Sequence, residues 1–410
     1  MTGPSPPHAP PAGRTLLVLG ILLVAAALRA PITAIAPVLP AIRADFALGT
    51  AQAGLLTTLP LLTFALLSPI STLLARGCGL ERTLFAAIAL VGGGIAVRSF
   101  GPAWCLFAGT MILGTGIAIA NVLLPGLLKR DFPDRIATMT AAYAVTMGIA
   151  AAGMSALMIP LAHATGSGWR LPLATAILFP AAALAVWLPQ LGGHTTTVDG
   201  SPPPRDGRVW RSALAWQVTA FMGLNSFLFY VLVGWFPSIL ADAGFSATDA
   251  GALHGLMQIS GAAPGLLLGP IVARMRDQRL VACIVSLATV AALLGLLLLP
   301  GWAVLWSVCF GIGNGSTLIL SLMFMSLRAT SPHQAAALSG MAQSVGYGLA
   351  AVGPPLAGLL HDASGGWHVP LGLCVALSGV MVVAGVLAGR SRTIAARHDP
   401  RRPDGRPRAA

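Results

Sequence analysis

The chain has 410 residues, of which 56% are hydrophobic and 9% are charged, with a formal net charge of +12 and a mean hydropathy of +0.82. Soluble globular proteins carry about 25% charged residues, so this composition excludes a water-soluble globule. Apolar runs near the ~20 residues that a helix needs to cross a bilayer recur along the chain, which also excludes a transmembrane β-barrel.

The chain begins with a proline-rich segment, residues 1–13, which we interpret as a disordered tail because it lacks the pattern of a signal peptide. Apolar runs then predict twelve transmembrane helices. They lie near residues 15–38, 52–75, 83–99, 103–128, 137–162, 170–189, 212–236, 250–273, 280–300, 303–327, 334–360 and 368–389. The polar segment 190–211 predicts a solvated cytoplasmic linker. The predicted architecture is therefore all-α, with six-helix halves at 14–189 and 212–389 and a basic cytoplasmic tail at 390–410.

The basic residues predict the orientation. With a cytoplasmic N-terminus, twenty of the 24 Lys and Arg residues fall in cytoplasmic segments, only Arg43, Arg98 and Arg170 fall outside, and Arg29 lies within a span. This positive-inside bias places both termini in the cytoplasm. The excess charge is then a topology signal, so we expect no nucleic-acid partner, and we expect the basic tail to face the membrane surface.

The two halves resemble each other when the chain is shifted by about 198 residues. Three positions of PAIRADFALGTAQAG match three of PSILADAGFSATDAG, and they are Pro40, Asp45 and Gly54 against Pro237, Asp242 and Gly251. A repeat of six helices is a parallel repeat, with a pseudo-two-fold axis along the membrane normal. This organisation is typical of secondary transporters with a central site between the halves.

Twelve predicted spans, the repeat, and basic loops after the second and eighth helices resemble the major facilitator superfamily. Four segments are similar to the cyanate permease and 2-nitroimidazole transporter family, namely RAPITAIAPVLPAI (29–42), AGLLTTLPLLTFALLSP (53–69), GTGIAIANVLLPGLLKRDFP (114–133) and LSGMAQSVGYGLAAVGPPLAGLLHD (338–362). The resemblance implies a bacterial inner-membrane protein that moves a small polar or anionic solute, such as a cyanate-like anion or a small azole. Import is favoured, and the alternative is efflux of a neutral drug or metabolite.

Two departures from the superfamily pattern bear on mechanism. The loop after the second helix reads STLLARGCGLER and lacks the usual aspartate, so Arg76, Glu81 and Arg82 are candidates for a substitute ion pair. The fifth helix, AAYAVTMGIAAAGMSALMIP (141–160), lacks the proline-glycine signature of the superfamily's antiporters, which weakens the drug-efflux interpretation.

Arg29 is the most informative candidate site residue. It follows Arg14 by fifteen residues, which is ~22 Å along a helix and too deep for easy snorkelling. A buried arginine costs at least ~2.5 kcal/mol on insertion scales and normally has a partner, yet every acidic residue falls in a predicted loop or helix end. We therefore expect Arg29 to meet an anionic or strongly dipolar substrate. The alternative is a structural role on backbone carbonyls opened by Pro31 and Pro37.

His254 and Gln258 lie one turn apart in the eighth predicted helix, where they can line one stripe of the cavity. His254 is the proton-coupling candidate, because an unperturbed histidine titrates near pH 6.5. The alternative is a neutral histidine that bonds between helices.

Other polar or aromatic residues in the spans complete the predicted substrate site. They are Asn121, Tyr143, Asn225, Tyr230, Trp235, Asn314 and Gln343. The amides have helix-to-helix bonding as their alternative role. Trp235, Phe229 and Tyr230 are a candidate lid over a planar substrate, or else interfacial anchors.

No enzyme class fits the sequence. A membrane enzyme would need a nucleophile, metal ligands or paired carboxylates at membrane depth, and His254 alone, with no central acid, does not make such a constellation. The five cysteines form no CxxC pair, so neither a metal site nor a disulfide framework is expected. We expect no cofactor. The expected partners are a small-molecule substrate and the lipid bilayer, and nothing in the sequence requires more than a monomer.

Overall fold

The computed structural model describes residues 11–132, 135–192, 209–264, 268, 272 and 274–394, and the regular structure of these residues is helical throughout. The first half contains α1 (Pro11–Thr33), α2 (Ile35–Phe46), α3 (Thr50–Cys78), α4 (Leu80–Ser99), α5 (Ala103–Asp131), α6 (Ile136–Thr165), α7 (Arg170–Thr175) and α8 (Leu178–Trp187). The second half contains α9 (Ala213–Asp242), α10 (Ala247–Ala262), α12 (Arg279–Leu298), α13 (Ala303–Leu327), α14 (Pro332–Ser364) and α15 (His368–Ala388).

Two predicted spans are divided into shorter helices, and a proline accounts for each break. α1 ends at Thr33, four residues before Pro37, and α7 ends at Thr175, beside Ala176, which lies four residues before Pro180. A proline has no N–H to donate to the carbonyl four residues earlier, and its ring presses on that carbonyl. The first and sixth predicted spans are therefore kinked.

Nine helical segments within the described ranges are long and apolar enough to cross a membrane. These nine confirm the prediction of a polytopic helical membrane protein. α3, α10 and α14 are not among them, and α10 has only 16 residues before its end at Ala262. The total of twelve spans stays a prediction.

The predicted domain boundaries coincide only in part with described residues. α1 begins at Pro11, inside the segment 1–13 that was predicted as a tail. Residues 1–10, the central part 193–208 of the linker, and residues 395–410 of the basic tail lie outside the described residues.

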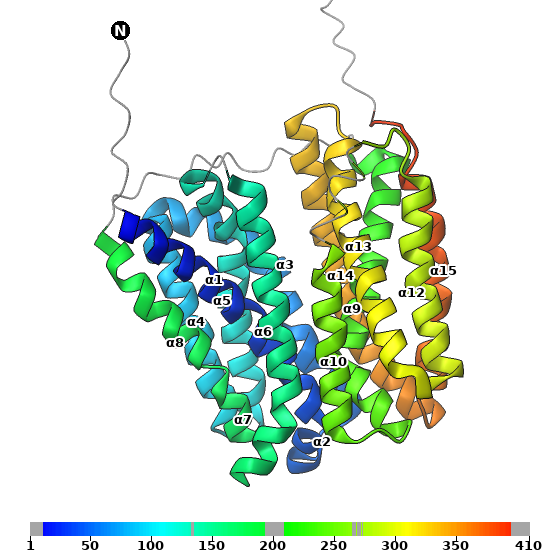
Figure 1. The fold of residues 1–410 in the computed structure, drawn as a ribbon. Helices are drawn as coiled ribbons and strands as arrows, with labels where there is room; N and C mark the ends of the chain where they lie inside the picture. The colour runs from blue at the N-terminus through cyan, green and yellow to red at the C-terminus, as the bar shows by residue number, and fades with distance from the viewer. Residues whose placement is uncertain are drawn as a thin grey trace, which may run out of the picture.

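Figure 1 shows α1 to α8 gathered in one bundle and α9 to α15 in a second, with the start of α1 and the end of α15 at the same end of the molecule. Between the bundles, α3 packs on α14, α6 packs on α10, and α2 reaches α9 and α10.

These contacts are tightest at the end opposite Pro11. A Cβ on Gly54 would lie 2.7 Å from the Pro354 carbonyl oxygen, and one on Gly255 would lie 2.7 Å from the Ala152 carbonyl oxygen. At both positions the helices of the two halves meet through backbone, which only glycine permits.

Candidate functional site

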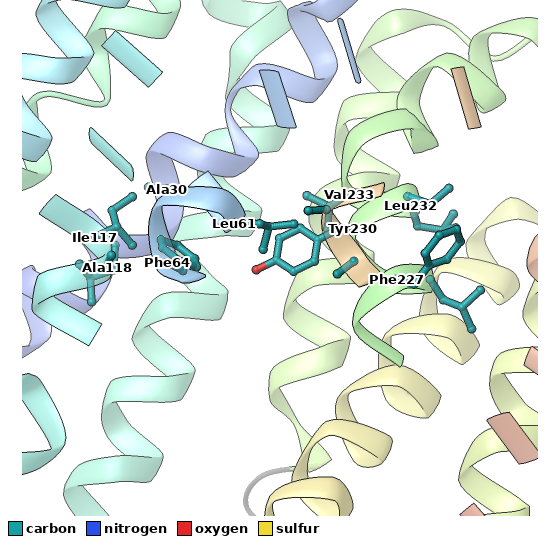
Figure 2. Close-up of a cluster of buried hydrophobic side chains, with 14 of the residues drawn as sticks. Ala30, Leu61, Phe64, Ile117, Ala118, Phe227, Tyr230, Leu232 and Val233 are labelled. Carbon is teal, nitrogen blue, oxygen red and sulfur yellow. The ribbon is translucent and has the colours of Figure 1, made fainter. Parts of the chain in front are cut away.

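A cavity of about 1210 Å³ lies between the two bundles, and its wall combines α1, α3, α5 and α6 with α9, α10, α13 and α14. Figure 2 shows two of its aromatic wall residues, Phe64 on α3 and Tyr230 on α9, with the Tyr230 hydroxyl directed across toward α3. The structure therefore has a cavity between the halves, where the sequence predicts the substrate site.

The cavity extends toward one end of the molecule only. Its lining reaches Pro125 on α5, Thr140 on α6 and Leu327 on α13, all at the end where α1 begins and α15 ends. Toward the other end it stops where α3 meets α14 and α6 meets α10, at the backbone contacts of Gly54 and Gly255. The structure is thus closed at the α2–α3 end and open toward the end where α1 begins and α15 ends.

Eight of the ten predicted site residues line this cavity. They are Arg29, Asn121, Tyr143, Asn225, Tyr230, Gln258, Asn314 and Gln343. The other two, Trp235 and His254, do not.

The side chain of Arg29 projects from α1 into the cavity, and its guanidinium has no hydrogen bond or ion pair to any other described residue. Its one recorded side-chain contact is with the ring of Phe229, whose centroid lies 4.6 Å from the guanidinium carbon. Among the lining residues there is no aspartate or glutamate, so no described carboxylate of the wall offsets its charge. The alternative in which Arg29 bonds opened backbone carbonyls has no such bond among the described residues.

All three tyrosines of the protein line the cavity, from three helices. Tyr143 comes from α6, Tyr230 from α9 and Tyr347 from α14, and the charge of Arg29 acts electrostatically on each. Arg29 and Tyr143 belong to the first half, and Tyr230 and Tyr347 belong to the second. Polar groups of both halves therefore converge on one centre.

Tyr347 was missed in the sequence analysis, although a signal was available. It lies four residues after Gln343, on the same face of a helix, and its ring lies edge-on to Phe64 at a centroid distance of 6.4 Å. Phe229 was predicted only as part of a lid, and it lines the cavity beside Tyr230 at 5.1 Å.

The amides of the wall divide into paired and unpaired groups. Asn314 Nδ2 donates to Asn225 Oδ1 at 2.9 Å and to the Asn225 carbonyl at 3.1 Å, which joins α13 to α9. Gln343 Nε2 donates to Ser339 Oγ at 2.8 Å within α14. Gln258 Nε2 is buried without a hydrogen-bond partner among the described residues. Arg29 and Gln258 therefore supply unused donors, and a donor-rich site suits a ligand with acceptor atoms.

Comparison with known proteins identifies the family. Residues 18–351 match the Major Facilitator Superfamily. A 2-nitroimidazole transporter of Escherichia coli (strain K12) is 50% identical over 382 residues, which are 93% of this chain and 97% of the relative. The chain belongs to the major facilitator superfamily. The transporter is also 27% identical to a cyanate transport protein of the same organism over 377 residues, 90% of this chain and 96% of the relative.

A solved structure shows the same fold. The transporter matches a bacterial homolog to the human lysosomal transporter Spinster, crystallised in an inward-facing and unoccupied conformation, with a TM-score of 0.70 and 15% identity. The match covers 93% of this chain and 98% of that one. Together with the relatives, it confirms the major facilitator fold, the predicted family and a transport protein in place of an enzyme.

His254, which the sequence predicts in the substrate site, does not line the cavity of the transporter in this structure. Its ring is fully buried, and Nδ1 lies 2.6 Å from Ser155 Oγ on α6, while Nε2 has no partner among the described residues. The neighbouring Gln258 reaches the cavity because it is one turn, about 5.4 Å, nearer the open end. His254 instead lies in the closed contact between α10 and α6. This geometry is that of a histidine bonded between helices.

Trp235 is the second predicted site residue that does not line the cavity. Its side chain is fully buried, Nε1 donates to the Pro354 carbonyl at 2.8 Å, and its ring packs on Trp367 at 5.2 Å. It lies about 9 Å along α9 beyond Phe229, past the closed end of the cavity. Trp235 therefore joins α9 to α14, and it is neither a lid over the cavity nor a lipid-facing anchor.

The loop after the second predicted helix lacks the usual aspartate, and Glu81 was one of the candidates for a substitute ion pair. Glu81 does form an ion pair in the structure. Glu81 at the start of α4 forms an ion pair with Arg130 near the end of α5, at 2.6 Å. Arg130 also pairs with its neighbour Asp131 at 2.8 Å, and the hydrogen bonds that its guanidinium donates to Asp131 are the main cause that raises the pKa of Arg130. The basic partner is thus Arg130 and not Arg82, and the side chain of Arg76 lies outside the described part of the chain.

Proposed function

We propose that this transporter moves a small polar or anionic solute across the bacterial inner membrane by alternating access, and that Arg29 binds that solute. The observation that carries the proposal is the unpaired guanidinium of Arg29 in a cavity wall whose described residues include no carboxylate. A charge at membrane depth normally has a partner. A substrate with negative charge or strong acceptor atoms would be that partner.

The proposed topology has twelve spans, in halves at 14–189 and 212–389, with the linker 190–211 and both termini in the cytoplasm. The excess of arginine and lysine near the open end supports this orientation. In this orientation the cavity of the structure opens to the cytoplasm. Transport would then require the contacts at Gly54 and Gly255 to separate while the halves close at the other end.

The relatives support the proposed substrate class at a coarse level. One relative is named a 2-nitroimidazole transporter and another a cyanate transport protein. A small azole and a cyanate-like anion both offer acceptor atoms to Arg29 and Gln258. We favour import by a monomer. Efflux of a neutral drug or metabolite is the rival, and the apolar part of the wall, such as Met147, Met257 and Leu322, favours it.

Uptake into vesicles containing the purified protein tests the proposal. We expect accumulation of labelled cyanate or 2-nitroimidazole that falls strongly in Arg29→Ala and also falls in Arg29→Lys, since an ammonium cannot reproduce the planar guanidinium fork. Arg43→Ala, on α2 and outside the cavity lining, is the matched control for loss of one arginine. Equal uptake by wild type and Arg29→Ala would contradict the proposal, and movement of neutral hydrophobic dyes alone would favour efflux.

A further inference from the structure

Phe229 and Arg29 come from opposite halves of the transporter, and their contact is the only one recorded for the Arg29 guanidinium among the described residues. Phe229 lies on α9 and lines the cavity, where its ring also packs edge-on against Tyr230. A guanidinium over an aromatic face is attracted by the negative face of the ring. Phe229 thus offers Arg29 a favourable contact that uses none of its hydrogen-bond donors.

The donors of a guanidinium lie in its plane, at its edge. A ring beneath one face therefore restrains the group and leaves the N–H groups of the edge available. A carboxylate partner would have done the opposite, because it would have occupied the edge with a bidentate pair.

The charge of the cavity wall determines which ligand charge the site can balance. Among the described lining residues Arg29 is the one charged side chain. A ligand with a single negative charge would bring the site to neutrality, whereas a second negative charge would remain uncompensated in a poorly solvated place.

The shape of the wall adds a preference for flat ligands. Phe64, Phe229 and the three tyrosines place aromatic surfaces around the Arg29 charge. Such surfaces favour a flat ring by stacking or edge-to-face contact.

We propose that Phe229 is a positioning residue that holds Arg29 by its face, and that the site so formed selects a planar aromatic anion carrying one charge. The proposal rests on the proposed function, because it assumes that Arg29 meets the substrate. It adds a role for Phe229, a single negative charge on the ligand and a flat ligand shape, none of which the proposed function alone requires.

Three probes of one ring size separate charge from shape. Benzoate carries one charge, phthalate carries two at pH 7.5, and benzamide is neutral. Calorimetric titration of the full-length protein in detergent should give tightest binding for benzoate, with both other probes at least about tenfold weaker, which corresponds to 1.4 kcal/mol.

The variants test the role of Phe229. Phe229→Leu should weaken benzoate binding by about tenfold, since a desolvated cation–π contact has that order of strength, and Phe229→Tyr should restore it. The ratio of the affinity for benzoate to the affinity for benzamide should decrease in Phe229→Leu. Loss of packing alone would weaken both ligands and leave this ratio unchanged. Phe310→Leu is the matched control, because Phe310 lines the cavity without a recorded contact to Arg29.

The outcomes separate the two proposals. If Arg29→Ala removes benzoate binding while Phe229→Leu binds like wild type, the role of Phe229 is refuted and the proposed function stands. If Arg29→Ala binds benzoate like wild type, the proposed function itself fails. Equal binding of phthalate and benzoate by wild type would overturn the selection for one charge, and absence of benzoate binding to wild type would overturn the substrate class.

Discussion

Arg130 and Arg328 lie 198 residues apart, at equivalent positions of the two repeats, and each braces the open end of its half. Arg130 reaches Glu81 at the start of α4. Arg328 reaches Gln278, which precedes α12, and donates from Nε to the Ala388 carbonyl at the end of α15, at 2.8 Å. The repeat thus keeps an arginine at the end of its fourth helix, with an ionic partner in one half and neutral partners in the other.

This difference predicts unequal tolerance of lysine. Arg328 is buried, and a lysine there cannot reach Gln278 and the α15 carbonyls together, so Arg328→Lys should lower the free energy of unfolding by about 2 kcal/mol. Arg130→Lys should cost under about 1 kcal/mol, because a point charge can still pair with Glu81 in a partly exposed site. Thermal unfolding of both variants in detergent measures the difference. Equal losses would contradict this account of the two braces.

The Asn225–Asn314 pair predicts coupled effects on stability. Removing one amide leaves a buried partner without its hydrogen bond, which costs about 1–3 kcal/mol. We therefore expect Asn225→Ala and Asn314→Ala each to lower the unfolding temperature, and the double variant to lose less than the sum. Asn121→Ala, whose side chain is not in this pair, is the control. Additive losses in the double variant would show that the two amides act separately.

The contact between His254 and Ser155 predicts that His254 contributes to the closed state and not to proton coupling. A proton on the imidazole would add a second positive charge within the electrostatic reach of Arg29, and no described carboxylate of the cavity wall compensates either charge. We expect His254→Gln, which can still bond to Ser155, to transport with the same dependence on external pH as wild type. Uptake measured from pH 5 to 8 checks this. A pH dependence that disappears in the variant would assign proton coupling to His254.

The closed end has an acid-sensitive contact between Thr50 and Asp362, which joins α3 to α14. The hydrogen bond from the Thr50 hydroxyl is the main cause that lowers the pKa of Asp362 below its ordinary value, and His361 acts in the same direction. A lowered pKa in the folded state contributes stability that is complete above the unfolded value of about 3.9, and that is lost as pH falls through the folded value.

The expected pH profile of stability follows from this sign. Between pH 5 and 8 the contribution of Asp362 should be constant, so Asp362→Asn should differ from wild type by a fixed shift in unfolding temperature. As pH falls below about 4 the two curves should approach each other, and they should meet only below the lowered pKa of folded Asp362, where wild type also carries an uncharged side chain. Curves that converge near neutral pH would contradict the assignment.

Much of the site could be predicted because polar residues are rare in apolar spans. Arg29, Gln258 and the wall amides stand out against their helices, and each costs energy in a bilayer unless it faces a cavity or a partner. Tyr347 was missed because a tyrosine is less conspicuous among apolar residues, even though Gln343 one turn earlier marks the same face.

The sequence does not show that His254 and Trp235 lie away from the cavity wall. His254 and Gln258 share a helix face, so periodicity alone treats them alike, and Trp235 follows Phe229 by six residues on the same helix. What separates them is the depth at which the halves touch. The contacts of Gly255 with Ala152 and of Gly54 with Pro354 close the cavity between them, and a contact between distant segments leaves no local pattern in the sequence.

The central claim is that Arg29 meets an anionic ligand, and thermal-shift binding to purified wild type and Arg29→Ala tests it most directly. The panel contains small anions, including cyanate and benzoate, and neutral azoles, since a ligand that binds the folded state raises the unfolding temperature. We predict that an anion stabilises wild type and that this stabilisation vanishes in Arg29→Ala. Stabilisation by neutral azoles alone, unchanged in the variant, would contradict the claim and make Arg29 a structural residue.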